Sequence, residues 1–408
     1  AFQQAFLNVD ALDPSGEVFI NGKSVAKLNR RPVRLDVTRF LKPGSNLIAV
    51  KVDHVVDGFY LADGHTSKDL YYGWFAARMS LDLTSPVHVD DVFVYTEKLG
   101  DPATVKVTVE LSNDGTKAFD GEAVIRFFPW YPTESANASV EEHVAIKLAA
   151  SKSLTISRSI SLPNPLLWDY KHPNLYRVTV TLLDGTGKSQ DDYVVTTGIR
   201  TISEEGGIFR INGREEVLNG ATWMQFLAPF TESTTWHRCC PKEWIVKGIL
   251  MTRAMAGNTI RKHEASSAYS DPRFAEIGDQ LGIMYMWVST GWARKEWTKT
   301  NKNPDGSAMS LDKSVEEFTL DMRQVRNSPS IVMWEIFNEG VSKGNKDKVF
   351  KAFYPAMFKT DSSRFIMPLK GNYHNDPMVA KGGQIDTLGY AKKWKALRDR
   401  PMDELGQD

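Results

Sequence analysis

Cysteine is almost absent from this sequence of 408 residues, which contains only the adjacent pair Cys239 and Cys240. Two neighbouring thiols cannot form a disulfide framework. Together with His237 they offer three metal-binding side chains, but they lack the separated spacing of zinc sites. We therefore expect no metal site and no cofactor.

Long apolar runs and net charge are also absent. No run approaches the roughly 18 residues that a membrane-spanning helix needs, so we expect no membrane span. The 50 Lys and Arg balance the 50 Asp and Glu, which gives no reason to expect nucleic acid as a partner. The opening AFQQAFLNVDALD lacks the basic and apolar regions of a signal peptide. The sequence does not fix the compartment, although we expect a periplasmic or secreted location rather than a cytoplasmic one.

The sequence before residue 220 has a strand pattern. EVFINGKSV predicts a hairpin on Asn21-Gly22, and VHVDDVFVYT, ATVKVTVEL and LYRVTVTLL repeat the period of two. Roughly 200 such residues fit two sandwiches better than one, with the joint near Thr84–Val87. We expect sandwiches over 1–85 and 86–200, and a further hairpin on Asn212-Gly213.

After Trp223, helical periods alternate with short apolar strands. SDPRFAEIGDQLG predicts a helix capped by Asp271 and ended by Gly282, and Ser310 can cap another helix. The strand candidates are 216–222, 258–263, 283–288, 331–338, 364–369, 386–390 and 400–404. This alternation predicts a parallel α/β domain over 201–408. We expect a (β/α)8 barrel, although the chain supplies fewer than the roughly 250 residues that are usual for one.

The stretch PSIVMWEIFNEG, residues 329–340, places two carboxylates in an apolar run. If 331–338 is a barrel strand, Asn338 and Glu339 lie at its carboxyl end, where the active sites of such barrels sit. Glu335 lies on the same face and deeper in the barrel. A buried carboxylate needs a partner, and Arg261 can provide the charge. Such a pair would support the site rather than perform the chemistry.

NSPSIVMWEIFNEG resembles the acid/base strand of glycoside hydrolase family 2, the family of β-galactosidases, β-mannosidases, β-glucuronidases and exo-β-glucosaminidases. EVFINGKSV and LDVTRFLKPGSNLIAVKV are similar to its jelly-roll domain, and NPLLWDYKHPNLYRVTVTLLD with TTGIRTI to its immunoglobulin-like domain. GGIFRINGREEVLNGATW is similar to the entry to its barrel. The resemblance implies a jelly-roll domain over 1–85, an immunoglobulin-like sandwich over 86–200 and a catalytic TIM-type barrel over 201–408, with both ends of the chain incomplete.

The resemblance also implies a retaining exo-β-glycosidase that acts on terminal galactoside-, mannoside- or glucosaminide-type sugars. Such enzymes use two carboxyl groups about 5–5.5 Å apart. Glu339 matches the acid/base residue, and Asn338 matches the amide that holds the sugar 2-hydroxyl. RPMDELG resembles the strand of the nucleophile, which makes Glu404 the candidate, although Leu405 replaces the expected aromatic residue.

A carbohydrate is the partner that the resemblance implies. Arg261 and His263 match substrate-side positions of the second strand, with His263 one residue out of register. The sugar-stacking candidates, each with core packing as its alternative, are Trp223, Trp287, Trp292 and Trp334. The sequence does not specify the sugar, the aglycone or the number of chains that assemble.

Two other functions stay open. One is a carbohydrate-binding relative, or an inactive fragment, without turnover. The other is an unrelated barrel enzyme for a carbonyl or phosphate substrate. That enzyme would need a Schiff-base lysine, metal ligands or a phosphate loop, and the sequence has no Gly-rich phosphate motif or spaced His cluster.

Overall fold

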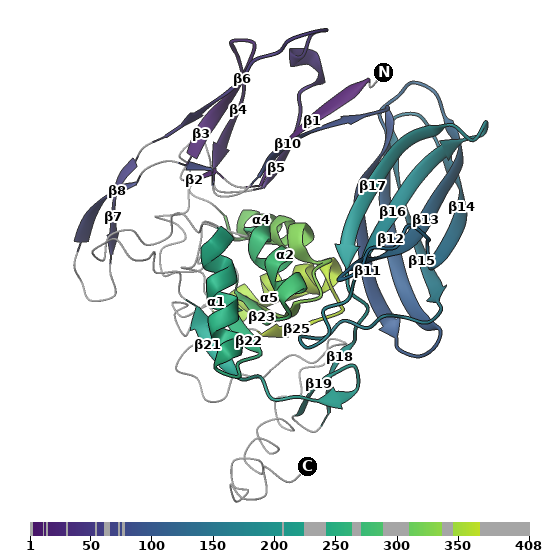
Figure 1. Cartoon of the computed structure of the whole chain (residues 1–408). Coiled ribbons are helices and arrows are strands. Elements are labelled where there is room, and N and C mark those ends of the chain that lie inside the picture. The colour runs from purple at the N-terminus through teal and green to yellow at the C-terminus, as the bar shows by residue number, and fades with distance from the viewer. Residues whose placement is uncertain are drawn as a thin grey trace, which may run out of the picture.

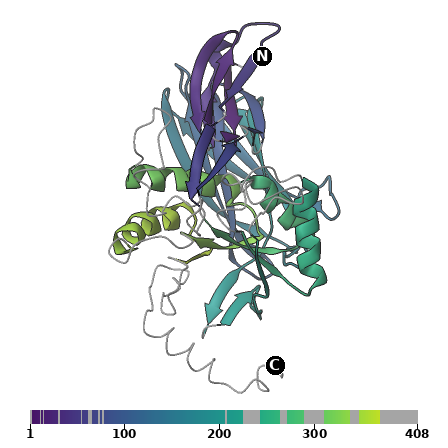
Figure 2. The same ribbon diagram turned by 90° about the vertical axis from the view of Figure 1, so that its left-hand side faces the viewer.

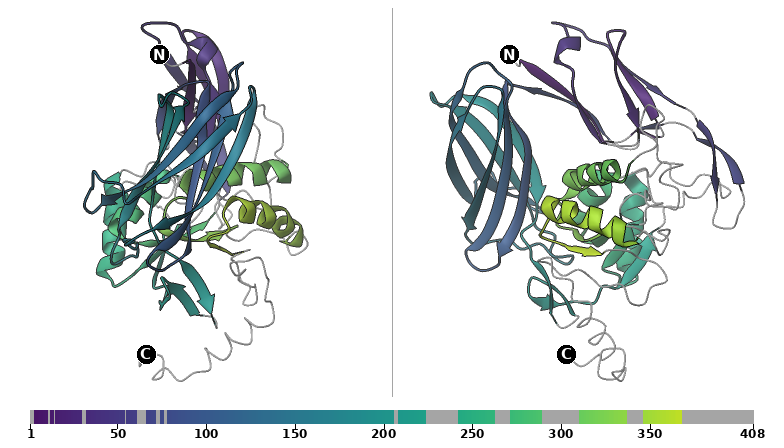
Figure 3. Two further views of the ribbon diagram at one scale, coloured as in Figure 1. Left: turned by 90° about the vertical axis from the view of Figure 1, so that its right-hand side faces the viewer. Right: turned by 180° about the vertical axis from the view of Figure 1, so that it is seen from behind.

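Two β-sandwiches and a parallel α/β domain follow one another along the chain (Figure 1). The computed structural model describes residues 3–10, 12–13, 15–29, 32–53, 55–60, 66–71, 74–75, 78–205, 208–223, 242–262, 271–288, 310–336 and 346–367. In Figure 1 the first sandwich stands above the α/β domain and the second stands beside it; Figure 2 and Figure 3 show the same arrangement from other sides. Among the described residues, no helix is long and apolar enough to cross a membrane.

The first sandwich contains the sheets β10-β1-β5 and β4-β3-β6 and the strand pairs β2-β9 and β7-β8. Its elements are β1 (Gln4–Val9), β2 (Leu12–Asp13), β3 (Ser15–Ile20), β4 (Lys23–Asn29), β5 (Val33–Asp36), η1 (Thr38–Phe40), β6 (Ile48–Val52), β7 (Val55–Tyr60), β8 (Thr66–Tyr71), β9 (Trp74–Phe75) and β10 (Met79–Thr84). Leu7 of β1 and Val18 of β3 share one apolar core. The predicted hairpin on Asn21-Gly22 is confirmed, because both residues have the positive φ that a tight two-residue turn requires.

The second sandwich packs the sheet β11-β12-β15 against the sheet β14-β13-β16-β17. Its strands are β11 (Val87–Lys98), β12 (Ala103–Asn113), β13 (Phe119–Tyr131), β14 (Val140–Leu148), β15 (Lys152–Leu162), β16 (Leu175–Asp184) and β17 (Ser189–Thr197). The period of two in the sequence produces this packing. In β12 every second residue from Ala103 onward is buried, and the residues between them are half-buried.

A small sheet, β18-β19-β20, leads from the second sandwich to the α/β domain. It consists of β18 (Ile202–Glu205), β19 (Ile208–Ile211) and β20 (Arg214–Glu215). The predicted hairpin on Asn212-Gly213 joins its last two strands, and both turn residues have positive φ. The Asn212 side chain also donates to the Trp168 carbonyl, which ties the hairpin to the segment that precedes β16.

The α/β domain has five described strands in one parallel sheet, in chain order β21-β22-β23-β24-β25. They are β21 (Gly220–Trp223), β22 (Thr259–Lys262), β23 (Met284–Val288), β24 (Ile331–Glu335) and β25 (Phe365–Met367). The helices are α1 (Lys242–Ala254), α2 (Pro272–Leu281), α4 (Leu311–Val325) and α5 (Lys346–Thr360). Because each strand pairs with the next one along the chain, the described part has the winding of a (β/α)8 barrel. The strand candidates at 386–390 and 400–404 lie outside the described residues.

Local signals placed two of these helices correctly. The Asp271 side chain accepts a hydrogen bond from the Arg273 amide at the start of α2, and Gly282 ends that helix with φ of 69°. Ser310 caps α4 by accepting from the Lys313 amide. Each cap satisfies an amide that the first helical turn leaves without a partner.

Candidate active site

A buried ion pair lies inside the barrel at the carboxyl ends of β22 and β24. Arg261 donates from Nε to Glu335 Oε2 at 2.7 Å and from Nη2 to Glu335 Oε1 at 2.6 Å. The two side chains are 5% and 0% exposed. This forked geometry compensates the charge of a carboxylate that could not be buried alone. The predicted pairing is confirmed, whereas the supporting role of the pair and substrate binding by Arg261 stay predictions.

The tryptophans of β23 and β24 point away from this interior. Trp334 is fully buried in the apolar core shared with the helices, and its indole nitrogen donates to Asp361 Oδ2 at 2.8 Å. Trp287 lies in the same core, with Lys262 Nζ 4.6 Å from the centroid of its ring. The expectation that Trp334 stacks on a sugar is therefore wrong for this structure, because no face of its ring is open. Core packing, the alternative for both residues, accounts for them.

A second polar cluster lies at the amino ends of β24 and β25. Arg364 donates to Asp361, to the Ser328 carbonyl at 2.6 Å and to the Ile331 carbonyl at 2.7 Å. Burial opposes ionisation of Asp361, but the Arg364 charge and hydrogen bonds from Ser363 and Trp334 outweigh it and hold the pKa of Asp361 below its ordinary value. The carboxylate is therefore charged in the folded protein.

Asp279, on α2, belongs to the same cluster but behaves differently. It accepts from Ser328 Oγ and from the Ser330 amide. Burial raises the pKa of Asp279 to about 6, because these hydrogen bonds and the charge of Arg364 compensate its loss of water only in part. Asp279 and Asp361 are both buried acids, and their partners move their pKa values in opposite directions.

Sequence reasoning missed this second cluster. Its charged members, none of which was singled out, are Arg200, Asp279, Asp361 and Arg364. A usable signal was present: Arg364 opens a strand candidate, and Asp279 lies beside the apolar face of a predicted helix. A charge at the margin of an apolar face is a candidate for a buried polar network.

The remaining predicted site residues lie largely outside the described part of the chain. These residues are Asn338, Glu339, Glu404, His263 and Trp292. Trp223 ends β21, but its side chain is also outside the description. Within the described residues, no group of three or more His, Cys, Asp or Glu side chains could hold a metal ion.

Comparison with known proteins assigns the family. The sequence model described as "Glycosyl hydrolases family 2" matches residues 87–200, and that described as "Glycosyl hydrolases family 2, TIM barrel domain" matches residues 204–386. The chain belongs to glycoside hydrolase family 2. The two matches cover the second sandwich and the barrel, in the order that the sequence predicted.

Relatives within glycoside hydrolase family 2 are distant. The β-galactosidase of Thermoanaerobacter pseudethanolicus is 24% identical over 373 residues, which cover 89% of this chain and 46% of that protein. Among solved structures, Bacteroides uniformis β-glucuronidase has a TM-score of 0.68 at 20% identity and covers 89% of this chain and 44% of its own. A family 2 member from Bacteroides cellulosilyticus has a TM-score of 0.71 at 18% identity, with 96% of this chain and 47% of its own covered. The chain thus spans less than half the length of these family 2 relatives, and the structures support the shared fold alone.

Proposed function

We propose that this chain is part of a retaining exo-β-glycosidase that releases terminal galactoside-, mannoside- or glucosaminide-type sugars. The observation that carries the proposal is the Arg261–Glu335 pair, which anchors the carboxyl end of β24. The residues that match the family's acid/base motif, Asn338 and Glu339, follow directly along the chain.

The proposed reaction uses two carboxyl groups in two steps. Glu339 donates a proton to the glycosidic oxygen while Glu404 attacks the anomeric carbon, so that the aglycone leaves as an alcohol and a glycosyl ester forms. Glu339, now a carboxylate, then takes a proton from water as the water attacks the anomeric carbon and releases Glu404. Asn338 holds the sugar 2-hydroxyl throughout.

The charge of the supporting pair favours a sugar that carries no carboxylate. Glu335 already compensates the positive charge of Arg261 through two hydrogen bonds. A uronate carboxylate beside this pair would meet no net positive charge from it. β-Glucuronidases occur among the similar structures. The preference for a sugar without a carboxylate therefore needs a test of its own, in which a glucuronide is compared with the other sugars.

The test compares turnover of four aryl β-glycosides, a galactoside, a mannoside, a glucosaminide and a glucuronide, by the unaltered protein and by Glu339→Gln. We expect one of the three sugars without a carboxylate to be released. Glu339→Gln should lower kcat/KM, which reports the step that breaks the glycosidic bond, by about 10²–10⁴ on a poor leaving group and much less on a dinitrophenyl glycoside, which needs no proton donor. Glu316→Gln, an exposed change on α4, is the control and should keep full activity.

Each outcome of this panel has a definite meaning. Preference for the glucuronide would contradict the expectation of a sugar without a carboxylate and leave the proposed glycosidase activity standing. Full activity of Glu339→Gln on the poor leaving group would remove Glu339 from the mechanism. A folded protein that releases none of the sugars but binds one of them would favour the carbohydrate-binding relative.

A further inference from the structure

Strand β24 contains one more residue than its neighbour requires. Tyr285 of β23 is opposite Ile331, but the next residue, Met286, is opposite Met333, so that Val332 is the additional residue of a β-bulge. Bulges change the side of a sheet on which the following side chains lie.

This bulge determines where Glu335 points. Ile331 packs in the core shared with the helices, Val332 and Met333 both pack in the cluster that contains Met284, and Trp334 returns to the helix side. If residues 331–335 alternated strictly, with no bulge at Val332, Trp334 would lie inside the barrel and Glu335 would lie against the helices. The Arg261–Glu335 pair thus depends on the bulge.

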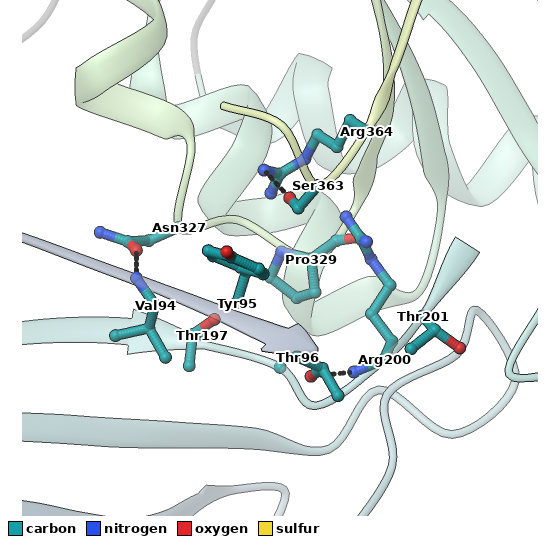
Figure 4. Close-up of a pocket in the computed structure, with 11 residues that line it drawn as sticks. Val94, Tyr95, Thr96, Thr197, Arg200, Thr201, Asn327, Pro329, Ser363 and Arg364 are labelled. Atoms are coloured by element: carbon teal, nitrogen blue, oxygen red, sulfur yellow. Dashed lines mark hydrogen bonds between the residues drawn. The ribbon is translucent and has the colours of Figure 1, made fainter. Parts of the chain in front are cut away.

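Two buried arginines hold the backbone at this bulge. The Ile331 carbonyl accepts from Arg200 Nη2 at 2.6 Å and from Arg364 Nε at 2.7 Å, and Arg200 Nε also donates to the Pro329 carbonyl at 2.8 Å. Figure 4 shows the Arg200 side chain reaching Pro329 from the segment that follows β17, with Arg364 on the barrel side of the same pocket. A carbonyl at a bulge is displaced from regular strand pairing, and the guanidinium groups give it alternative donors.

Of the two arginines that hold the bulge, Arg200 is the one that comes from outside the barrel. Its own amide donates to Thr96 Oγ1 of β11, which fixes the backbone of Arg200 to the second sandwich. Within the described residues its side chain forms hydrogen bonds only to backbone carbonyls, whereas Arg364 is anchored by Asp361. Burial outweighs the charges of Asp361 and Asp279, which favour the charged form of Arg200, and lowers the pKa of Arg200 to about 9. A buried guanidinium whose hydrogen bonds all go to carbonyls is costly, so packing does not explain an arginine at this position.

We propose that Arg200 is a positioning residue: it holds the bulge at Val332 and thereby fixes, from the second sandwich, the face on which Glu335 and the residues after it lie. The effect of Arg200 on turnover rests on the proposed function, since Asn338 and Glu339 follow β24 in sequence. The effect of Arg200 on the order of β24 does not depend on the proposed function.

Arg323 supplies a matched control. It also joins the barrel to the second sandwich, through α4 and Glu110, with hydrogen bonds of 2.9 and 2.7 Å. Its side chain is 34% exposed, and it contacts Glu110 and Asp91 rather than β24. Arg323→Gln therefore removes an arginine between the same two domains without touching the bulge.

The experiment compares Arg200→Gln, Arg200→Lys and Arg323→Gln in the full chain, at a temperature where each is folded. It measures kcat and KM on the aryl glycoside that is turned over, and amide hydrogen exchange in the peptides that contain β24. For Arg200→Gln we expect kcat to fall about 10–100-fold with KM little changed, because small displacements of catalytic groups cost that much. Exchange in β24 should accelerate, while exchange in β12 should not change.

The two other variants complete the test. Arg200→Lys keeps the charge but cannot reach both carbonyls with a planar fork, so its kcat and its exchange in β24 should be intermediate. It also serves if Arg200→Gln does not fold. Arg323→Gln should leave both measurements unchanged.

Unchanged kcat together with unchanged exchange in β24 in the Arg200 variants would overturn the proposal, even if their melting temperatures fell. Equal effects of Arg323→Gln would overturn it as well. If the unaltered protein turns over no glycoside, the proposed function fails, and exchange in β24 alone decides the role of Arg200.

Discussion

At the scale of single residues, two buried carboxylate–arginine pairs lie at opposite ends of the barrel strands. Glu335 meets Arg261 in the barrel interior at the carboxyl end of the strands, and Asp361 meets Arg364 at their amino end. A buried pair is weak evidence for stability, since desolvation of two charges offsets their attraction. The position of the Arg261–Glu335 pair at the end of β24, which the motif with Glu339 follows in sequence, is the better reason for its presence.

Breaking the Arg261–Glu335 pair should cost more than removing it entirely. We predict that Glu335→Leu and Arg261→Met each lower the free energy of unfolding by about 3–5 kcal/mol, because each removes the group that forms two hydrogen bonds to the remaining buried charge. The double variant should lose much less than the sum of the single losses. Urea unfolding of the four proteins, followed by tryptophan fluorescence, gives the coupling energy. Additive losses would show that the two side chains do not depend on each other.

At the scale of elements, sequence signals predicted the turns and helix caps, which depend only on neighbouring residues. The hairpins on Asn21-Gly22 and Asn212-Gly213 and the caps at Asp271 and Ser310 each depend on a few neighbouring residues, and all four were predicted. The bulge at Val332 was not predictable in this way, since it exists only in the register between β23 and β24.

The same limit applies to the site. The Arg261–Glu335 pair was predictable because a charge within an apolar strand requires a partner, and few cations were available near the strand ends. The interior face of β24 was also inferred from the strand period, which places Glu335 and Glu339 on one side. The same period places Trp334 on the opposite face, toward the helices, and that is where it lies, so the choice of Trp334 as a sugar-stacking residue overlooked this signal. Arg200 reaches β24 from another domain, and no spacing in the sequence encodes that contact.

The polar cluster at the amino ends of β24 and β25 contains two buried acids, Asp279 and Asp361, whose replacement should change stability in opposite directions. The pKa of Asp279 is raised to about 6, so that its ionised form destabilises the folded state above that pH, and the penalty disappears as the pH falls toward 4. We predict that Asp279→Asn stabilises the protein by roughly 2–3 kcal/mol at pH 7.5 and hardly at all at pH 4.

Asp361 provides the comparison, since its pKa is lowered. Its charged form contributes stability above its ordinary pKa, and this contribution is lost as the pH falls. Asp361→Asn should therefore destabilise the protein at pH 7.5, and the loss should shrink in acid. Urea unfolding of both variants from about pH 2.5 to pH 8 checks the signs, because the contribution of Asp361 is lost only below its ordinary pKa of about 4. The same sign for both changes at pH 7.5 would contradict this account.

At the scale of the whole molecule, the second sandwich contacts the amino end of β24, whereas the proposed catalytic motif follows the carboxyl end of that strand in sequence. Arg200 and Asn327 both act at the amino end of β24, whereas Glu335 is its last residue. In barrels of this kind the amino-terminal face carries stability and the carboxyl-terminal face carries catalysis. Strand β24 crosses between the two faces, so the sandwich can influence the site without contacting a substrate.

The Asn327 side chain, just before β24, forms hydrogen bonds to the backbone of β11 at the edge of the second sandwich. Its Oδ1 accepts from the Val94 amide at 2.9 Å, and its Nδ2 donates to the Val92 carbonyl at 2.7 Å. Among the described strands, β11 pairs only with β12, and the Asn327 amide takes the place of a neighbouring strand's backbone on its other edge. An unpaired strand edge at a domain junction would otherwise leave backbone polar groups without partners.

Removing this contact should loosen the junction and leave each domain intact. We predict that Asn327→Ala lowers the free energy of unfolding by about 1–3 kcal/mol, the usual cost of part-buried groups that lose their hydrogen bonds. Asn327→Asp keeps the acceptor for Val94 but loses the donor to Val92, so that it repels the carbonyl and should not restore the lost stability. Calorimetry should show the barrel and sandwich transitions moving apart in both variants. If Asn327→Ala instead leaves a single transition at the original temperature, the junction is held by the arginines alone, and the amide at 327 contributes nothing to docking.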